Sequence, residues 1–234
     1  MDAARLAGMI DHTLLKADAT ALQIRQLCAE AVEHGFYSVC VNPRWIPFAV
    51  QCLDHAPVLP ITVVGFPLGA SLAGAKAREA REAVAAGAQE IDMVLDVGGA
   101  RSGLWDEVTN DIRDVVAASG GKPVKVILET CYLSDDEIRR ACAAAAAGGA
   151  RFVKTSTGFG SGGATVAHIR LMRDCVGPDL GVKASGGIRD TATALALVEA
   201  GANRLGCSAS IAIIRGLAAS ATAATADGGT HGLY

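Results

Sequence analysis

Residues 152–159 read Phe152-Val153-Lys154-Thr155-Ser156-Thr157-Gly158-Phe159. This β-branched run carries one lysine and ends in hydroxyl side chains and a glycine, which predicts a short buried strand that opens into a loop. Residues 181–189 repeat the layout around Lys183, with the glycine pair Gly186 and Gly187. Lysine is poorly suited to a buried strand, because its ammonium group loses water there and its pKa falls. Two such strands in succession indicate a functional site.

The rest of the chain alternates between strand-like and helix-like segments. The other strand-like segments lie at about residues 9–13, 37–41, 60–67, 90–97, 124–129 and 203–208. A helical pattern fills each interval, and two of the helices begin with a capping box, at Thr20–Gln23 and at Ser134–Glu137. This alternation is typical of parallel βα architecture. Eight units favour a single (β/α)8 TIM barrel over an open sheet.

The length of 234 residues is near the typical size of such a barrel. No linker, charge block or change of composition divides the chain before its end, so we expect one barrel domain over residues 1–217. From about residue 218 the sequence is rich in alanine, threonine and glycine. This composition predicts a flexible tail over residues 218–234.

Composition and charge argue against several classes of protein. The net charge of -3 provides no basic field for nucleic acid. No signal-peptide pattern and no long apolar run occur, so we expect no membrane association. The seven cysteines are odd in number and lack C-x-x-C spacing, which is typical of reduced thiols in a cytoplasmic protein.

Two loops of the predicted barrel are suited to an anion. The loops after strands seven and eight of such barrels often bind phosphate, and the sequence places Gly186-Gly187 and Gly206-Cys207-Ser208 there. Glycine lets backbone N–H groups approach a phosphate closely, and a following helix N-terminus adds a favourable dipole. Such glycines also form strand-to-helix turns with no ligand, but two adjacent loops of this type favour a phosphorylated substrate.

Lysine acts as an amine nucleophile only when it is neutral, and at its usual pKa about one molecule in 2,500 is neutral at pH 7. Burial and a neighbouring cation both lower a lysine pKa. Lys154 and Lys183 lie on adjacent predicted strands, so each can be the neighbouring cation that lowers the pKa of the other. The alternative is that each lysine pairs with a carboxylate in a structural network, such as Asp92, Asp96 or Glu129. Lys125 is a third strand lysine, and residue type and position leave it open as the nucleophile.

Asp92 stands among apolar residues of a predicted strand, so desolvation is expected to raise its pKa toward a range useful for proton transfer. A lone strand aspartate is as often an ion-pair partner, and Asp11 has the same two interpretations. None of the five histidines stands at metal-ligand spacing from another His, Cys or carboxylate, so we expect no metal site.

Four segments in the same order resemble the motif set of the deoxyribose-phosphate aldolase family. They are Glu90-Ile91-Asp92-Met93-Val94, Val124-Lys125-Val126-Ile127-Leu128-Glu129-Thr130, Phe152-Val153-Lys154-Thr155-Ser156-Thr157-Gly158-Phe159 and Val182-Lys183-Ala184-Ser185-Gly186-Gly187-Ile188-Arg189. The resemblance covers about residues 9–215. It implies a class I aldolase on a (β/α)8 barrel that reversibly cleaves 2-deoxy-D-ribose 5-phosphate to acetaldehyde and D-glyceraldehyde 3-phosphate. The implied chemistry is a lysine Schiff base that needs no metal and no organic cofactor.

The resemblance also assigns roles by position. Lys154 matches the Schiff-base lysine, Lys183 the lysine that perturbs it, Asp92 the proton-relay acid and Asp11 a secondary member of that relay. The positions that match the phosphate site are Gly158, Gly186, Gly187, Gly206 and Ser208. These roles require an uncharged amine at position 154 that faces the sugar site and is not held by a carboxylate.

Some positions depart from the family pattern. Asp96 stands where the family usually has an amide, Cys207 where it often has threonine and Ser71 where asparagine is common. We expect Asp96 to add a negative charge near the mouth of the site. Tyr234 ends the chain, as in some family members, where it would be able to fold back over the site.

Two rival functions are compatible with the same residues. One is a Schiff-base barrel that acts on a different sugar phosphate, such as a transaldolase-like enzyme. The other is a barrel that binds a phosphorylated metabolite without turnover. In either case the expected partner is a small-molecule sugar phosphate, and a homo-oligomer is possible.

Overall fold

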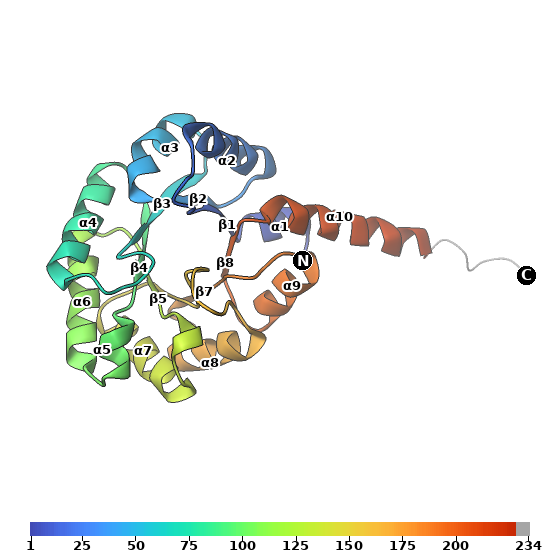
Figure 1. Ribbon diagram of the computed structural model, residues 1–234. Coiled ribbons are helices and arrows are strands. Elements are labelled where there is room, and N and C mark those ends of the chain that lie inside the picture. The colour runs from blue at the N-terminus through green and yellow to red at the C-terminus, as the bar shows by residue number, and fades with distance from the viewer. Residues whose placement is uncertain (228–234) are drawn as a thin grey trace, which may run out of the picture.

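The computed structural model describes residues 1–227, in which eight parallel strands close into one barrel in chain order (Figure 1). The strands are β1 Ile10–Leu14, β2 Ser38–Val41, β3 Leu59–Val64, β4 Glu90–Val94, β5 Val124–Ile127, β6 Phe152–Lys154, β7 Gly181–Ser185 and β8 Arg204–Cys207. The last strand pairs with the first, with Asp11 opposite Gly206. The predicted (β/α)8 TIM barrel is confirmed.

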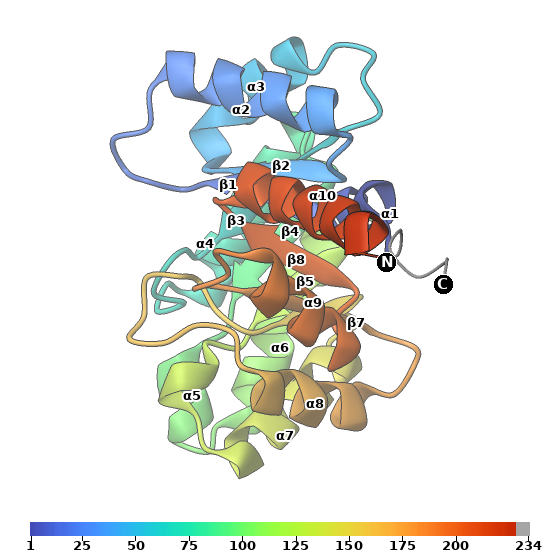
Figure 2. The ribbon, with the colours of Figure 1, turned by 90° about the vertical axis from the view of Figure 1, so that its right-hand side faces the viewer.

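Helices surround the strands on the outside (Figures 1 and 2). The helices are α1 Ala3–Ala7, α2 Ala21–His34, α3 Ile46–Cys52, α4 Ala73–Ala85, α5 Val97–Arg101, α6 Trp105–Ala118, α7 Asp135–Ala147, α8 Val166–Val176, α9 Thr191–Glu199 and α10 Ser210–Asp227, with 3-10 turns η1 Pro43–Trp45 and η2 Thr130–Tyr132. Both predicted capping boxes are confirmed, at the start of α2 with Thr20 and at the start of α7 with Ser134. Each box satisfies backbone N–H groups that the first helical turn leaves unpaired.

The C-terminal part of the chain differs from the sequence prediction. The predicted boundary at residue 217 falls inside α10, which begins at Ser210 and continues to Asp227. Alanine has the highest intrinsic helix propensity, so an alanine-rich run extends a helix as readily as it forms a tail. Residues 228–234, and with them Tyr234, lie outside the described residues.

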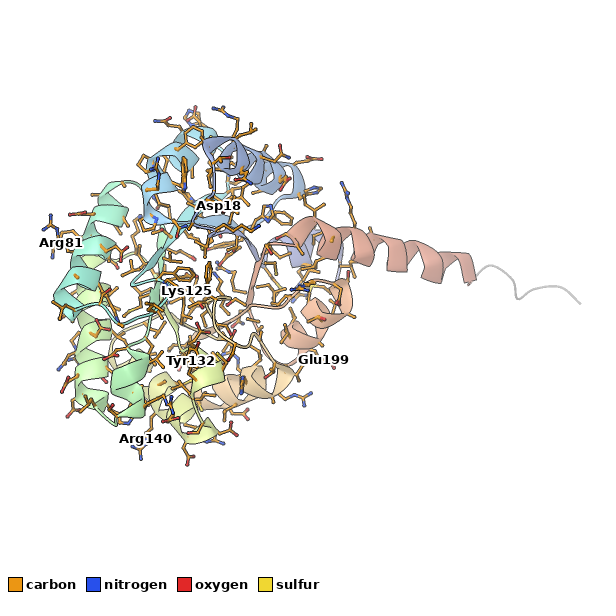
Figure 3. The ribbon with its side chains drawn as sticks, viewed as in Figure 1. Asp18, Arg81, Lys125, Tyr132, Arg140 and Glu199 are labelled. Carbon is orange, nitrogen blue, oxygen red and sulfur yellow. The ribbon has the colours of Figure 1, made fainter. Side chains whose placement is uncertain are left out.

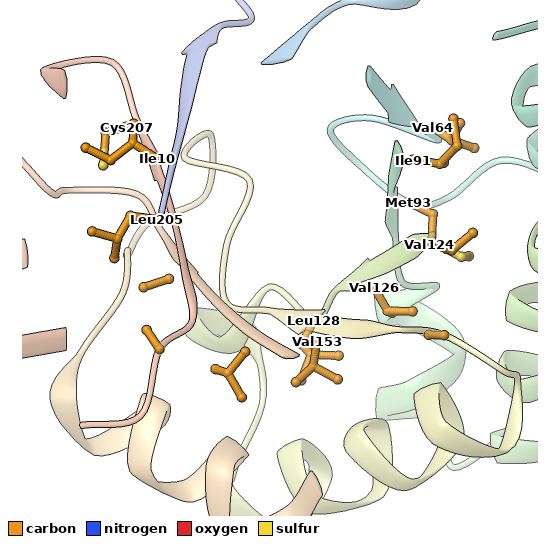
Figure 4. Close-up of a cluster of buried hydrophobic side chains, with 14 of the residues drawn as sticks. Ile10, Val64, Ile91, Met93, Val124, Val126, Leu128, Val153, Leu205 and Cys207 are labelled. Atoms are coloured by element: carbon orange, nitrogen blue, oxygen red, sulfur yellow. The ribbon is translucent and has the colours of Figure 1, made fainter. Parts of the chain in front are cut away.

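The strands place alternate side chains on opposite faces. Ile91 and Met93 of β4, and Val124 and Val126 of β5, face the helices and belong to the hydrophobic core between the two layers (Figure 4). Burial of such a side chain stabilises the fold by about 1.5–3 kcal/mol. The opposite face of the strands points to the barrel axis, where charged side chains of β4 and β5 lie beside a small apolar cluster from β2 and β3 that includes Cys40, Ile61 and Val63.

Candidate active site

Three lysines converge on one aspartate inside the barrel. The strand register places Asp92 opposite Lys125 and Lys154 opposite Lys183. Lys125 Nζ donates to Asp92 Oδ1 at 2.8 Å, and Asp92 Oδ2 accepts from Lys154 Nζ at 2.9 Å and from Lys183 Nζ at 2.7 Å. Figure 3 shows Lys125 near the centre of the ring, whereas Arg81 and Arg140 lie on its outer rim.

A second layer of ion pairs lies next to the first. Lys183 Nζ also contacts Asp11 Oδ2 at 2.5 Å, and Lys125 Nζ contacts Glu90 Oε2 at 2.5 Å. Arg204 Nη1 lies 3.0 Å from Asp11 Oδ1 and 3.2 Å from Glu90 Oε2. We call the linked side chains the interior ionic cluster; its members are Asp11, Glu90, Asp92, Lys125, Lys154, Lys183 and Arg204. All seven are buried.

The interior ionic cluster has four basic side chains and three carboxylates, so one base is left without a compensating charge. Lys125 and Lys183 each contact two carboxylates, whereas Lys154 contacts only Asp92. A buried charge without its own partner is costly, and a buried lysine avoids the cost by losing its proton. Charge balance is therefore best met with Lys154 neutral.

The pKa shifts of the lysines agree with this balance. Burial lowers the pKa of Lys154, and the charge of Lys183 lowers it further, against the opposing attraction of Asp92. Burial also acts on Lys183, but Asp11 and Asp92 outweigh it and raise the pKa of Lys183 above its ordinary value. Among the lysines of the interior ionic cluster, only Lys154 has a lowered pKa.

Two expectations from the sequence are wrong. Asp92 does not have a raised pKa: burial favours its protonated form, but Lys125, Lys154 and Lys183 outweigh burial and hold the pKa of Asp92 well below its usual range. Lys154 is also not free of a carboxylate, because Asp92 lies 2.9 Å from its nitrogen. The contact does not prevent the lowering of the Lys154 pKa, because Asp92 is shared with Lys125 and Lys183, whose pKa values are raised. Asp11 is likewise an anion, with its pKa lowered to about 2: burial raises it, but Lys183 leads the cations that outweigh burial.

A cavity of about 440 Å³ opens above the interior ionic cluster. Lys154 is 3% exposed and lines this cavity. Lys125 and Lys183 are fully buried and do not line it, so Lys154 alone of the three can reach a bound molecule. The predicted phosphate positions all line the same cavity; they are Gly158, Gly186, Gly187, Gly206 and Ser208. Asp92 and Asp11 lie beneath the cavity, fully buried.

Two cations of the cavity were not among the predicted site residues. Lys16 follows β1 and Arg189 follows the glycine pair after β7, and both are exposed side chains that line the cavity. Arg189 directly follows the motif Gly186-Gly187-Ile188, and this position could have indicated that it belongs to the site. Lys16 had no comparable signal, since only the closure of β1 on β8 brings it to the same loops.

Residues 5–219 match the model of a family described as DeoC/LacD family aldolase. The chain belongs to this aldolase family. A deoxyribose-phosphate aldolase of Coprothermobacter proteolyticus is 57% identical over 209 residues, which is 89% of this chain and 95% of that protein. One of Mannheimia succiniciproducens is 57% identical over 212 residues, 91% of this chain and 95% of that protein. The solved deoxyribose phosphate aldolase of Aeropyrum pernix, described as having a unique tetrameric structure, matches with a TM-score of 0.86 at 32% identity over 92% of this chain and 91% of that one. The predicted family is confirmed, and the protein is a lyase.

Asp96, one of the departures from the family pattern, has a local role. Its side chain accepts a hydrogen bond from the Gly99 N–H at 3.0 Å and caps the N-terminus of α5. Asp96 does not line the cavity. A carboxylate is favourable at this end of a helix. We expected the negative charge of Asp96 to act at the mouth of the site. Because Asp96 does not line the cavity, it has no direct contact with a molecule bound there.

The described part of the chain has neither a cluster of metal ligands nor a helix that could span a membrane. No group of three or more His, Cys, Asp or Glu side chains is arranged to hold a metal ion there. Nor does any described helix combine the length and the apolar character needed to cross a bilayer.

Proposed function

We propose that the protein reversibly cleaves 2-deoxy-D-ribose 5-phosphate to acetaldehyde and D-glyceraldehyde 3-phosphate through a Schiff base on Lys154. The observation that carries the proposal is the position of Lys154, which is the uncompensated base of the interior ionic cluster and the one lysine of that cluster that lines the cavity. The names of the two bacterial relatives support the choice of substrate.

The first half of the reaction forms the imine. Neutral Lys154 attacks the aldehyde carbon of the open-chain sugar phosphate, and its nitrogen becomes positively charged as the C–N bond forms. Asp92, in contact with this nitrogen, takes up its proton and returns it to the former aldehyde oxygen, and a second proton from solvent lets that oxygen leave as water, so that one proton is consumed for each protonated imine formed. Lys183 touches the same oxygen of Asp92 and supplies a positive charge that stabilises the anion between proton transfers.

The second half breaks the carbon–carbon bond. The protonated imine draws in the electrons of the bond between C2 and C3, while the C3 hydroxyl group loses its proton and becomes the aldehyde of glyceraldehyde 3-phosphate. An enamine remains on Lys154. Protonation at C2 and attack of water on the resulting imine release acetaldehyde and restore the free amine.

Product analysis tests this reaction directly. Purified protein with 2-deoxy-D-ribose 5-phosphate should release acetaldehyde and glyceraldehyde 3-phosphate in equal amounts. In the reverse direction these two aldehydes should give the five-carbon sugar phosphate. If no five-carbon product forms, a Schiff-base enzyme for another sugar phosphate, such as a transaldolase-like enzyme, becomes the better proposal. If no aldehyde substrate is turned over, the barrel is a binding module.

The cations of the cavity lead to a prediction about the phosphate. Arg189→Ala is expected to raise KM for 2-deoxy-D-ribose 5-phosphate by about tenfold, because a charge-assisted hydrogen bond to phosphate contributes about 1.5–3 kcal/mol. Lys16→Ala should raise KM in the same direction. Neither change should alter KM for unphosphorylated 2-deoxy-D-ribose by a similar factor. Equal losses on both sugars in steady-state assays would argue against a phosphate at this end of the cavity.

We also propose a cytoplasmic location and self-assembly. The seven cysteines are all free, which supports a reducing compartment. The tetrameric structure of the Aeropyrum pernix relative supports a homo-oligomer. Light scattering of the purified protein would measure its oligomeric state.

A further inference from the structure

Glu129 is a buried carboxylate outside the interior ionic cluster. It stands just after β5 and is 3% exposed. Its backbone has φ 55° and ψ 61°, in the left-handed region that side chains other than glycine rarely adopt. Within residues 1–227 only His55 is another non-glycine residue with a positive φ. Strain of this kind persists where the surroundings hold the residue in place, and it is frequent at functional sites.

Most contacts of Glu129 are with one residue of the loop after β6; the Cys131 thiol also donates to Oε1, at 3.9 Å. The backbone N–H of Thr157 lies 3.2 Å from Glu129 Oε1 and 3.3 Å from Oε2, and the Thr157 hydroxyl donates to Oε2. Thr157 Oγ1 in turn accepts the backbone N–H of Phe159 at 3.0 Å. The carboxylate therefore fixes the residues on both sides of Gly158, which lines the cavity.

The same loop is held from the side of β7. Thr155 Oγ1 donates to the Ser185 carbonyl oxygen at 3.0 Å and accepts the Ser185 N–H at 3.0 Å. The Ser185 hydroxyl donates to the carbonyl oxygen of Ser156 at 2.5 Å. Residues 155–159, which directly follow Lys154, are thus anchored to β7 on one side and to Glu129 on the other.

The buried carboxylate of Glu129 needs partners that compensate its burial. No basic side chain of the described residues forms an ion pair with it, so its burial is compensated by hydrogen bonds, chiefly those from Thr157 and a weaker one from the Cys131 thiol. A carboxylate next to a phosphate site also repels the negatively charged phosphate. A glutamate at this place is therefore unfavourable for binding unless it holds the neighbouring loop in position. We propose that Glu129 is a positioning residue, which acts through Thr157 to present the backbone of Gly158 to the phosphate of the substrate. The role rests on the proposed function.

The test compares two substrates that differ only in the phosphate. In Glu129→Ala, the ratio of kcat/KM for 2-deoxy-D-ribose 5-phosphate to kcat/KM for 2-deoxy-D-ribose should fall about tenfold, the expected size for loss of a charge-assisted hydrogen bond. Thr157→Val should lower the ratio similarly, and the double variant should lose less than the product of the two single losses. Binding of inorganic phosphate, measured by calorimetry, should also weaken about tenfold in Glu129→Ala.

Two control variants separate this role from a purely structural one. Glu129→Gly should lower the ratio as much as Glu129→Ala but melt at a higher temperature, because glycine relieves the positive φ. Glu137→Ala removes a glutamate that hydrogen-bonds Ser134 in the α7 capping box and not the loop of residues 155–159, and it should lower the melting temperature with no change in the ratio. An unchanged ratio in Glu129→Ala, or an equal loss on both sugars, would overturn the role.

The calorimetric readout keeps the two proposals distinguishable. If the wild type shows no aldolase activity but binds phosphate more tightly than Glu129→Ala does, the proposed function fails while the loop contact stands. If the wild type is active and both proteins bind phosphate equally, the positioning role alone is wrong.

Discussion

Lys154→Met is expected to abolish aldol cleavage while the protein stays folded. The reaction begins with the amine, so its removal should lower kcat/KM by at least about four orders of magnitude, as loss of a covalent nucleophile does in other enzymes. Methionine has a similar length, and volume-conserving replacements in a core usually cost less than about 1.5 kcal/mol. Asp92 keeps Lys125 and Lys183 as partners. Steady-state assays and denaturant unfolding would measure both effects.

The same variant reports the charge state of Lys154. A lysine whose folded-state pKa is depressed binds more protons when unfolded, so stability rises with pH between its folded-state pKa and its ordinary 10.5. The free energy of unfolding of the wild type relative to Lys154→Met should therefore increase with pH in that window, by up to about 1.4 kcal/mol per pH unit. A difference that stays flat or decreases would mean that Lys154 is charged in the folded protein.

Lys183→Leu is expected to raise the pKa of Lys154 and slow the reaction at neutral pH. Without Lys183, the interior ionic cluster has three basic side chains and three carboxylates, so a proton on Lys154 restores the balance. Below its pKa the neutral fraction of an amine falls tenfold for each unit of increase. We expect a loss of about ten- to a hundredfold in kcat/KM at pH 7, with partial recovery at higher pH.

The pH dependence of kcat/KM measures this shift, because it reports the pKa of groups in the free enzyme. The alkaline displacement of the profile should be absent in Lys76→Leu, which serves as a matched control. Lys76 is another fully buried lysine, paired with Asp111 at 2.6 Å between α4 and α6, and it does not line the cavity. Loss of either lysine should destabilise the protein, but only loss of Lys183 should move the profile. An unchanged profile in Lys183→Leu would exclude the coupling to Lys154.

The barrel could be predicted from the sequence because each strand has a recognisable local pattern of residues. Lys154 and Lys183 stand in β-branched or small-residue runs, and Thr20 and Ser134 begin helices with side chains that cap them. The short helix α5 escaped prediction because its five residues are too few for a helical periodicity. Composition likewise could not distinguish a tail from the alanine-rich continuation of α10.

The site was only partly predictable, because its electrostatics depend on how many partners each charge has. The sequence placed Lys154, Lys183 and Asp92 on strands, but the direction of the pKa shift of Asp92 followed from Lys125, whose contact required the register of β4 against β5. Arg204 and Glu90 meet only after the barrel closes. Pairwise reasoning from a sequence cannot find such a shared carboxylate.

Reductive trapping is the most direct test of a neutral amine at position 154. The wild type is incubated with acetaldehyde and cyanoborohydride near pH 7, digested, and its peptides are mapped by mass spectrometry. We predict one ethyl group on Lys154, with Lys125 and Lys183 unmodified because they remain charged and do not line the cavity. A label on Lys125 or Lys183 in place of Lys154, or no label on any of the three, would contradict the assignment of Lys154 as the nucleophile.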